Sequence, residues 1–262
     1  MSVPEIYKQV DAKYGRMLYN PNDKYIGRSL NLYGEFSEGE IALFRQLIKP
    51  GFVVLDIGAN IGCHTVFMAQ AMENSGRVIA IEPQRLTHQL LCANVALNSL
   101  FNVQCFNNAV GDSEGSITVP VLNPRSELNF GGLDLRQHKE GETIKQITID
   151  SLNLLSCEFI KLDIEGMELM ALMGARETIS KYMPPIYLEN DRKENSDDII
   201  RFLTSMGYRM YWHLPPLFNP NNHRKNPNNI FGDIVSRNMF CIPTNIEVNV
   251  TNMQEVKVPA EP

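Results

Sequence analysis

Five short apolar runs of the sequence each end at a residue with a polar side chain. In chain order these residues are Asp56, Glu82, Asn108, Asp163 and Glu189. Helical patterns separate most of the runs, which predicts parallel strands joined by right-handed crossovers. The carboxyl ends of parallel strands meet at one edge of the sheet, where open α/β folds bind ligands. Any one of these residues could be a solvated acid or amide, but their recurrence favours a binding site.

The first run leads into a glycine-rich turn. Residues 52–55 are apolar, Asp56 follows, and Gly58, Asn60 and Gly62 alternate with small or apolar residues before a helical pattern begins. Glycine allows close approach of the backbone, and the free N–H groups of a first helical turn attract polar or anionic groups. We therefore expect a ligand at this turn, with an ordinary strand-to-helix turn as the plainer alternative.

Glu82 narrows the kind of ligand. A carboxylate that closes the second strand, about 20 residues past a glycine turn, can accept hydrogen bonds from both hydroxyls of a ribose. The turn departs from the dinucleotide motif G-x-G-x-x-G, because Asn60 and Cys63 occupy two of its glycine positions. Asp56 would also repel a pyrophosphate and attract an amine. The turn therefore suits a zwitterionic nucleoside better than a nicotinamide dinucleotide.

The rest of the chain predicts the elements around this site. Residues 37–40 fit a helix capping box, with Ser37 as N-cap and Glu40 at the third helical position. Two final strands, over 208–212 and 234–242, flank a long polar connection of the kind that forms lids or is disordered. We divide the chain into an N-terminal helical and loop cap (1–46), an α/β domain (47–243) and a loose tail (244–262).

Composition favours a cytoplasmic protein and gives no support to a nucleic-acid partner. The net charge is −6 and the 24 basic residues are dispersed, whereas nucleic-acid binding needs Lys and Arg on one face. The five cysteines contain no CxxC pair, which indicates reduced thiols and no zinc site. No apolar run approaches the ~18 residues of a membrane helix. We expect neither a membrane nor a nucleic acid as partner.

Four motifs between residues 47 and 190 resemble the FkbM family of S-adenosylmethionine-dependent methyltransferases: VLDIGANIG, AIEP, NNAVGDSEG and FIKLDIEGMELMALMGA. The resemblance implies a class I methyltransferase (Rossmann-like) α/β fold, with a seven-stranded, mostly parallel sheet, an antiparallel last strand and helices on both faces. It also implies methylation of a hydroxyl group on a sugar or glycan, a polyketide or a similar small metabolite.

The resemblance also implies roles for individual residues. Asp56, Gly58, Asn60 and Gly62 would hold the methionine end of S-adenosylmethionine, Glu82 would bind its ribose, and Asn108 and Ala109 would lie beside the adenine. Asp163 would sit nearest the sulfonium and the acceptor. Many family members have a histidine shortly after the glutamate that ends the fifth strand, whereas this chain has Glu189-Asn190-Asp191.

The reaction needs a proton acceptor, because an alcohol must lose its proton during methyl transfer. We rank Asp163 first and keep Glu165 and Glu189 as further catalytic candidates; Glu165 could instead be an acid at a helix N-terminus. Glu168 is expected at the surface and His64 in packing. Asp163, Glu189 and Asn190 also resemble the oxygen ligands of magnesium-dependent methyltransferases, but this support is thin and we do not expect a metal.

Two other classes of function stay open. The first is a nucleic-acid or protein methyltransferase. Against methylation of base amino groups, Leu214-Pro215-Pro216-Leu217 only imitates the Asn/Asp-Pro-Pro-aromatic motif, without its acid or amide. The second is a non-catalytic nucleoside-binding protein, against which the carboxylates of Glu82 and Asp163 argue.

Overall fold

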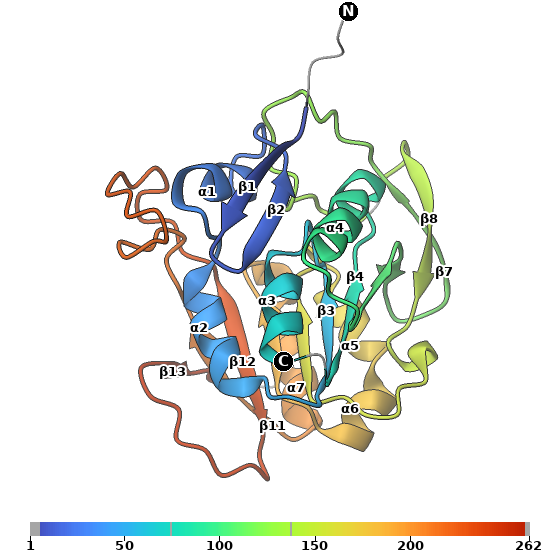
Figure 1. The fold of residues 1–262 in the computed structure, drawn as a ribbon. Helices are drawn as coiled ribbons and strands as arrows, with labels where there is room; N and C mark the ends of the chain where they lie inside the picture. Colours follow the sequence, from blue (N-terminus) through green and yellow to red (C-terminus); the bar gives the residue numbers. More distant parts are fainter. Residues whose placement is uncertain (1–5, 74, 137, 260–262) are drawn as a thin grey trace, which may run out of the picture.

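The computed structural model describes residues 6–73, 75–136 and 138–259, and a twisted sheet forms the centre of this part of the chain (Figure 1). Eight strands of the described residues build it. In spatial order they are β13 (Gln254–Glu255), β11 (Tyr208–His213), β12 (Asn238–Pro243), β10 (Ile186–Glu189), β9 (Phe159–Leu162), β3 (Val53–Ile57), β4 (Arg77–Ile81) and β5 (Val103–Phe106). The five strands from β10 to β5 are parallel, and β12 is antiparallel to both of its neighbours, β10 and β11.

The predicted α/β class and the antiparallel late strand are confirmed. The strand count differs from the expected seven, because β13 of the C-terminal tail pairs with Tyr211 and Trp212. An edge strand such as β11 leaves backbone N–H and C=O groups unpaired, and the tail satisfies some of them. Val256, next to β13, is buried, so this part of the tail is attached and not loose. Residues 260–262 of the predicted tail lie outside the described residues.

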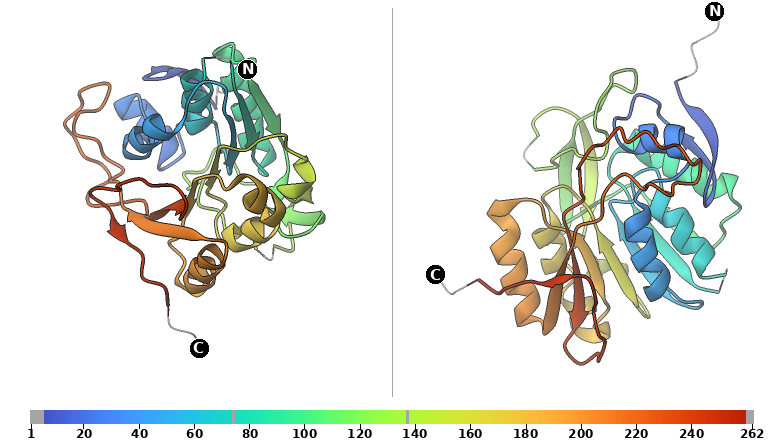
Figure 2. Two further views of the ribbon diagram at one scale, coloured as in Figure 1. Left: turned by 90° about the horizontal axis from the view of Figure 1, so that it is seen from below. Right: turned by 90° about the vertical axis from the view of Figure 1, so that its left-hand side faces the viewer.

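Helices cover both faces of the sheet. The helices of one face are α2 (Glu38–Leu47), α3 (Cys63–Ala71) and α4 (Arg85–Leu97), and those of the other are α5 (Glu168–Met173), α6 (Arg176–Tyr182) and α7 (Lys193–Ser205). Figure 2 shows the sheet between blue to cyan helices on one side and yellow to orange helices on the other. Side chains alternate along a strand, so Val54 packs in the α2–α4 layer while Leu55 and Ile57 pack in the other.

The N-terminal segment contains strands where the sequence analysis expected only a helix and a loop. β1 (Lys8–Ala12) and β2 (Gly15–Tyr19) form an antiparallel hairpin, and α1 (Ile26–Tyr33) follows. The amide side chain of Asn94 on α4 pairs with both backbone groups of Leu18, which ties the hairpin to the main layer. Residues 1–5 of the predicted cap lie outside the described residues, and the division into three segments stays a prediction.

Two long connections lie near the carboxyl edge of the sheet. The first contains a small sheet of β6 (Ala109–Val110), β8 (Glu142–Ile147) and β7 (Gly115–Val119), and leads on to β9 through a short 3-10 helix, Asp150–Leu152. The second, residues 214–237, runs beside α1 (Figure 1). The buried side chains of Tyr33 and Glu35 hold it through bonds to Asn228 and His223. It is therefore tied down on the N-terminal segment.

Phe44 gives a direct test of the α2 packing. Its fully buried ring meets Phe159 and Tyr187 edge-on, with centroids 5.3 and 5.0 Å away. Phe44→Ala should lower the free energy of unfolding by about 3–5 kcal/mol in urea denaturation, because it leaves a cavity between helix and sheet. Phe101 is 93% exposed, so Phe101→Ala should change it by less than about 0.5 kcal/mol. Equal losses in the two variants would contradict this packing.

Candidate functional site

A cavity of about 510 Å³ opens at the carboxyl edge of the sheet. Of the predicted residues, its wall contains Gly58, Asn60, Glu82, Asp163, Glu165 and Glu189. The same wall contains residues to which the sequence analysis assigned no part in the site: Glu40, His64, Lys161, Arg192 and Asn238. The structure therefore brings most of the predicted strand-end acids to one cavity and adds a second polar set to them.

The glycine turn is pressed between the ends of two neighbouring strands. Gly58 has a φ of +77°, and a Cβ atom there would clash with the backbone carbonyl of Asp163. The N–H groups of Gly58 and Ala59 both donate to the carbonyl of Ile81, at 2.9 and 3.0 Å. Glycine is needed at position 58 for both its conformation and this close approach.

Glu82 presents a buried carboxylate to the cavity. Its Oε2 accepts the N–H of Asn60 at 2.9 Å, and its Oε1 accepts the N–H of Gln84 at 2.8 Å. Burial raises the pKa of Glu82 to about 7, although these two hydrogen bonds oppose the shift. A carboxylate oxygen has a second lone pair, so each oxygen can also accept a hydroxyl. This fits the predicted ribose site.

Asp56 lies behind the cavity wall and holds a lysine. It is fully buried, accepts the hydroxyl of Thr65 at 2.6 Å, and its Oδ1 lies 3.1 Å from the Lys161 ammonium. The same ammonium donates to the Gly58 carbonyl at 3.1 Å and lies 3.6 Å from Asp163 Oδ2. The cation beside Asp56 is thus a residue of the chain, and Asp56 touches the glycine turn only through Lys161.

Lys161 stays charged in this environment. Burial lowers its pKa, but the charges of Asp56, Asp163 and Glu40 raise it more, so that the pKa lies above its usual value. The signal that could have identified it was a lysine between Ile160 and Leu162 in a buried strand, because lysine is almost never buried without a partner.

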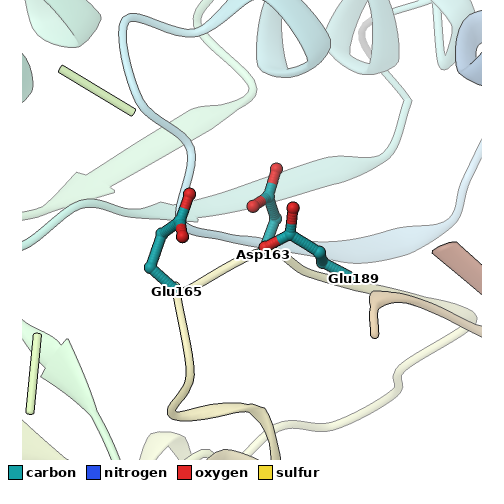
Figure 3. A group of neighbouring side chains, drawn as sticks. All are labelled: Asp163, Glu165 and Glu189. Carbon is teal, nitrogen blue, oxygen red and sulfur yellow. The ribbon is translucent and has the colours of Figure 1, made fainter. Parts of the chain in front are cut away.

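Asp163, Glu165 and Glu189 form a group of carboxylates at the cavity (Figure 3), with oxygen atoms that lie within 4.8 Å of one another. Burial, followed by the charge of Asp163, raises the pKa of Glu165 to about 8 and that of Glu189 to about 11. Arg192 Nη2 lies 2.6 Å from Glu165 Oε2 and brings a positive charge to the group. The group can therefore store a proton beside Asp163.

Three carboxylates at this spacing also offer oxygen ligands that Mg²⁺ accepts. The set differs from the one considered from the sequence, because Asn190 is buried and its amide donates to the sulfur of Met239. Glu165 stands in its place, and Arg192 already pairs with that carboxylate. The residues can hold a cation, and the chain supplies one itself.

Glu168 is buried, so the prediction of a surface position is wrong. Its carboxylate accepts the N–H groups of Ile164 and Gly166. These bonds hold a turn in which Glu165 and Gly166 have φ values of +54° and +97°. Since α5 begins only at Glu168, Glu165 belongs to this turn and not to a helix N-terminus, and the turn brings it to the carboxylate group.

Asn108 and Ala109 lie away from the wall of the large cavity. Asn108 donates to the carbonyl of Lys145 at 3.1 Å and lines a small neighbouring pocket. Ala109 is buried in β6. Asn107 is nearer to the ribose residue, because its amide donates to the carbonyl of Glu82 at 2.9 Å.

Glu40 faces the cavity and does not form the predicted capping box. Ser37 has a φ of +54° and its side chain makes no capping hydrogen bond. The Glu40 carboxylate instead accepts the amide of Asn238 at 2.9 Å and lies 3.3 Å from His64 Nε2. The helix therefore begins as predicted, while its third residue points inward.

A model of the methyltransferase FkbM domain matches residues 56–210, which is more than half of the chain. The chain belongs to the FkbM methyltransferase family. It is accordingly an S-adenosylmethionine-dependent methyltransferase, as the motifs indicated. A search of curated proteins found no match.

Three solved structures with a similar fold illustrate the range of this architecture. The methyltransferase FkbM from Methylobacillus flagellatus KT is 20% identical, with 76% of this chain and 50% of that chain covered and a TM-score of 0.49. For Trm5b from Pyrococcus abyssi the values are 11%, 93%, 57% and 0.50. For precorrin-6y C5,15-methyltransferase from Geobacter metallireducens GS-15 they are 14%, 77%, 86% and 0.49. The chain thus spans about half the length of the first structure.

Within the part of the chain that the structure describes, no helix has the length and apolar character to cross a bilayer. The cytoplasmic location expected from the sequence stays a prediction.

The buried ion pair of this FkbM methyltransferase can be tested by Lys161→Met. The variant leaves the Asp56 carboxylate buried without its counter-charge, and it should lower the free energy of unfolding by about 3–5 kcal/mol. Adding Asp56→Asn should recover part of the loss, because the uncompensated charge is removed. Lys145→Met, at an exposed position of β8, is the control. Urea denaturation followed by circular dichroism measures all three, and a Lys161 variant as stable as the control would contradict the ion pair.

Proposed function

We propose that this FkbM methyltransferase transfers the methyl group of S-adenosylmethionine to a hydroxyl group of a small metabolite, a sugar or glycan, or a polyketide-like acceptor. The observation that carries the proposal is the position of Asp163. Its carboxylate is 42% exposed to solvent at the cavity, while Lys161 holds it from the buried side at 3.6 Å. A carboxylate so placed can meet an acceptor that enters from solvent.

The proposed cofactor residues surround the glycine turn. Gly58, Asn60 and Gly62 shape the turn for the methionine end, and Asp56 acts on it through Lys161. Glu82 accepts the ribose hydroxyls with its free lone pairs. Asn108 and Ala109 stay the proposed neighbours of the adenine, with Asn107 between them and Glu82.

In the proposed mechanism the cofactor supplies an already activated methyl group, and the chain positions the acceptor and takes up its proton. Asp163 accepts the proton of the acceptor hydroxyl and passes it to solvent. Burial and the neighbouring acids hold the pKa of Glu189 at about 11, so its carboxyl group keeps a proton and can donate a hydrogen bond to the acceptor. Glu165, fixed by Arg192, orients this group.

The charges at the cavity support a neutral, hydroxyl-bearing acceptor. Asp163, Glu165 and Glu189 gather within 4.8 Å and would repel the phosphates of a nucleic acid. Arg192 provides positive charge next to Glu165, so the proposed mechanism needs no magnesium ion.

Glu82→Ala tests the cofactor site. It removes two acceptors of hydroxyl hydrogen bonds, and the dissociation constant for S-adenosylmethionine in isothermal calorimetry should rise roughly a hundredfold or more. Glu114→Ala, in an exposed turn, should bind like the wild type. Circular dichroism confirms that each variant is folded. A wild-type protein that does not bind S-adenosylmethionine would refute the proposal.

Asp163→Asn tests the proton acceptor. The variant should keep its affinity for S-adenosylmethionine and lose about 10²–10⁴-fold in kcat, measured with labelled cofactor on a panel of glycan and polyketide acceptors. Asp112→Asn, at an exposed position, is the control. Turnover equal to that of the control would remove Asp163 from the mechanism.

A further inference from the structure

Glu40 and His64 form a buried polar pair at the cavity. They are 5% and 6% exposed, and both contribute to the cavity wall. Glu40 comes from the first turn of α2 and His64 from the start of α3, where these helices pack on the same face of the sheet. The roles proposed above leave this pair without a function.

The pair has polar partners but lacks a cation of its own. The Asn238 amide donates to Glu40 Oε1 at 2.9 Å, whereas His64 Nε2 lies 3.3 Å from Oε2 without hydrogen-bond alignment. Lys161, the nearby ammonium, is held by Asp56, Gly58 and Asp163. Burial raises the pKa of Glu40 to about 7 and lowers that of His64 to about 3, so the imidazole is neutral. A cation from a ligand would give the carboxylate its missing partner.

The pair lies on the opposite side of the glycine turn from the ribose residue. Glu82 follows β4, on one side of β3, whereas Glu40 bonds to the first residue of β12 and feels the charge of Lys161 on β9, both on the other side. The β4 and β9 strands are two spacings apart, roughly 10 Å. A ligand with its ribose on Glu82 that crosses the turn therefore extends toward Glu40.

We propose that Glu40, supported by His64 and Asn238, binds the α-ammonium group at the amino-acid end of S-adenosylmethionine. The inference rests on the proposed cofactor site and assigns to it a residue on the N-terminal segment. It makes α2 part of the binding site, because Glu40 reaches the cavity only when α2 is packed on the sheet.

Other ligands fit Glu40 less well. A methyl acceptor entering from solvent meets the exposed Asp163 before it can reach a carboxylate that is 95% buried, at 5% exposure. A metal ion would need more oxygen ligands than this corner supplies, because the groups that face Glu40 are the Asn238 amide and the His64 imidazole. An ammonium group with three donors matches a carboxylate that has unused lone pairs.

Two ligands separate this role from the rest of the site. S-adenosylhomocysteine carries the α-amino acid, whereas 5′-methylthioadenosine keeps the adenosine and the sulfur but lacks the amino acid. Glu40→Gln should weaken binding of S-adenosylhomocysteine by roughly tenfold to a hundredfold in calorimetry and leave binding of 5′-methylthioadenosine unchanged. Glu40→Asp, which keeps the charge, should lose less. Glu38→Gln on the same helix should bind both ligands as the wild type does.

The same measurements distinguish the possible failures. Glu82→Ala should weaken both ligands, and if the wild type binds neither, the cofactor site itself is refuted. If the wild type binds both and Glu40→Gln weakens both equally, Glu40 supports the fold of the cavity and the inference is wrong. If Glu40→Gln binds both normally and only kcat falls, Glu40 acts on the proton of the acceptor, which also overturns the inference.

Discussion

One buried ammonium group organises the site of this methyltransferase. Lys161 lies in the middle of a strand and joins the end of β3, through Asp56, to the glycine turn, through the Gly58 carbonyl, and to the end of its own strand, through Asp163. A charge taken out of water must be paired, so these groups are held in one arrangement. The turn that receives the cofactor and the proposed proton acceptor thereby share a single support.

The turn after β9 converts this support into a chemical site. The Glu168 carboxylate holds the N–H groups of Ile164 and Gly166, and the left-handed conformation of Glu165 brings its carboxylate beside Asp163 and Glu189. Crowding of acids in a partly buried place favours their protonated forms, and Arg192 limits this by pairing with Glu165. One exposed carboxylate next to two that hold protons suits an exchange of protons with a hydroxyl group.

The parallel sheet also separates the two ends of the proposed cofactor site. Glu82 lies beyond β4 and Glu40 reaches the edge of β9 and β12, with the glycine turn of β3 between them. The FkbM match begins at residue 56, so Glu40 lies outside the matched segment. If Glu40 binds the ammonium group, packing of the N-terminal segment and binding of the cofactor are coupled.

The sequence by itself determined the elements whose signals are local. Apolar runs and helical periodicity located the strands from β3 to β10, and the glycine turn and Glu82 could be identified because their backbone and chemical requirements show in short motifs. Tertiary structure decided where side chains point. Glu40 was predicted to cap its own helix and Glu168 to face solvent, yet both are buried, since their partners come from distant residues or from a turn that only packing defines. Asp56 likewise meets Lys161 across two neighbouring strands, and the register of a parallel pair is set by the whole sheet.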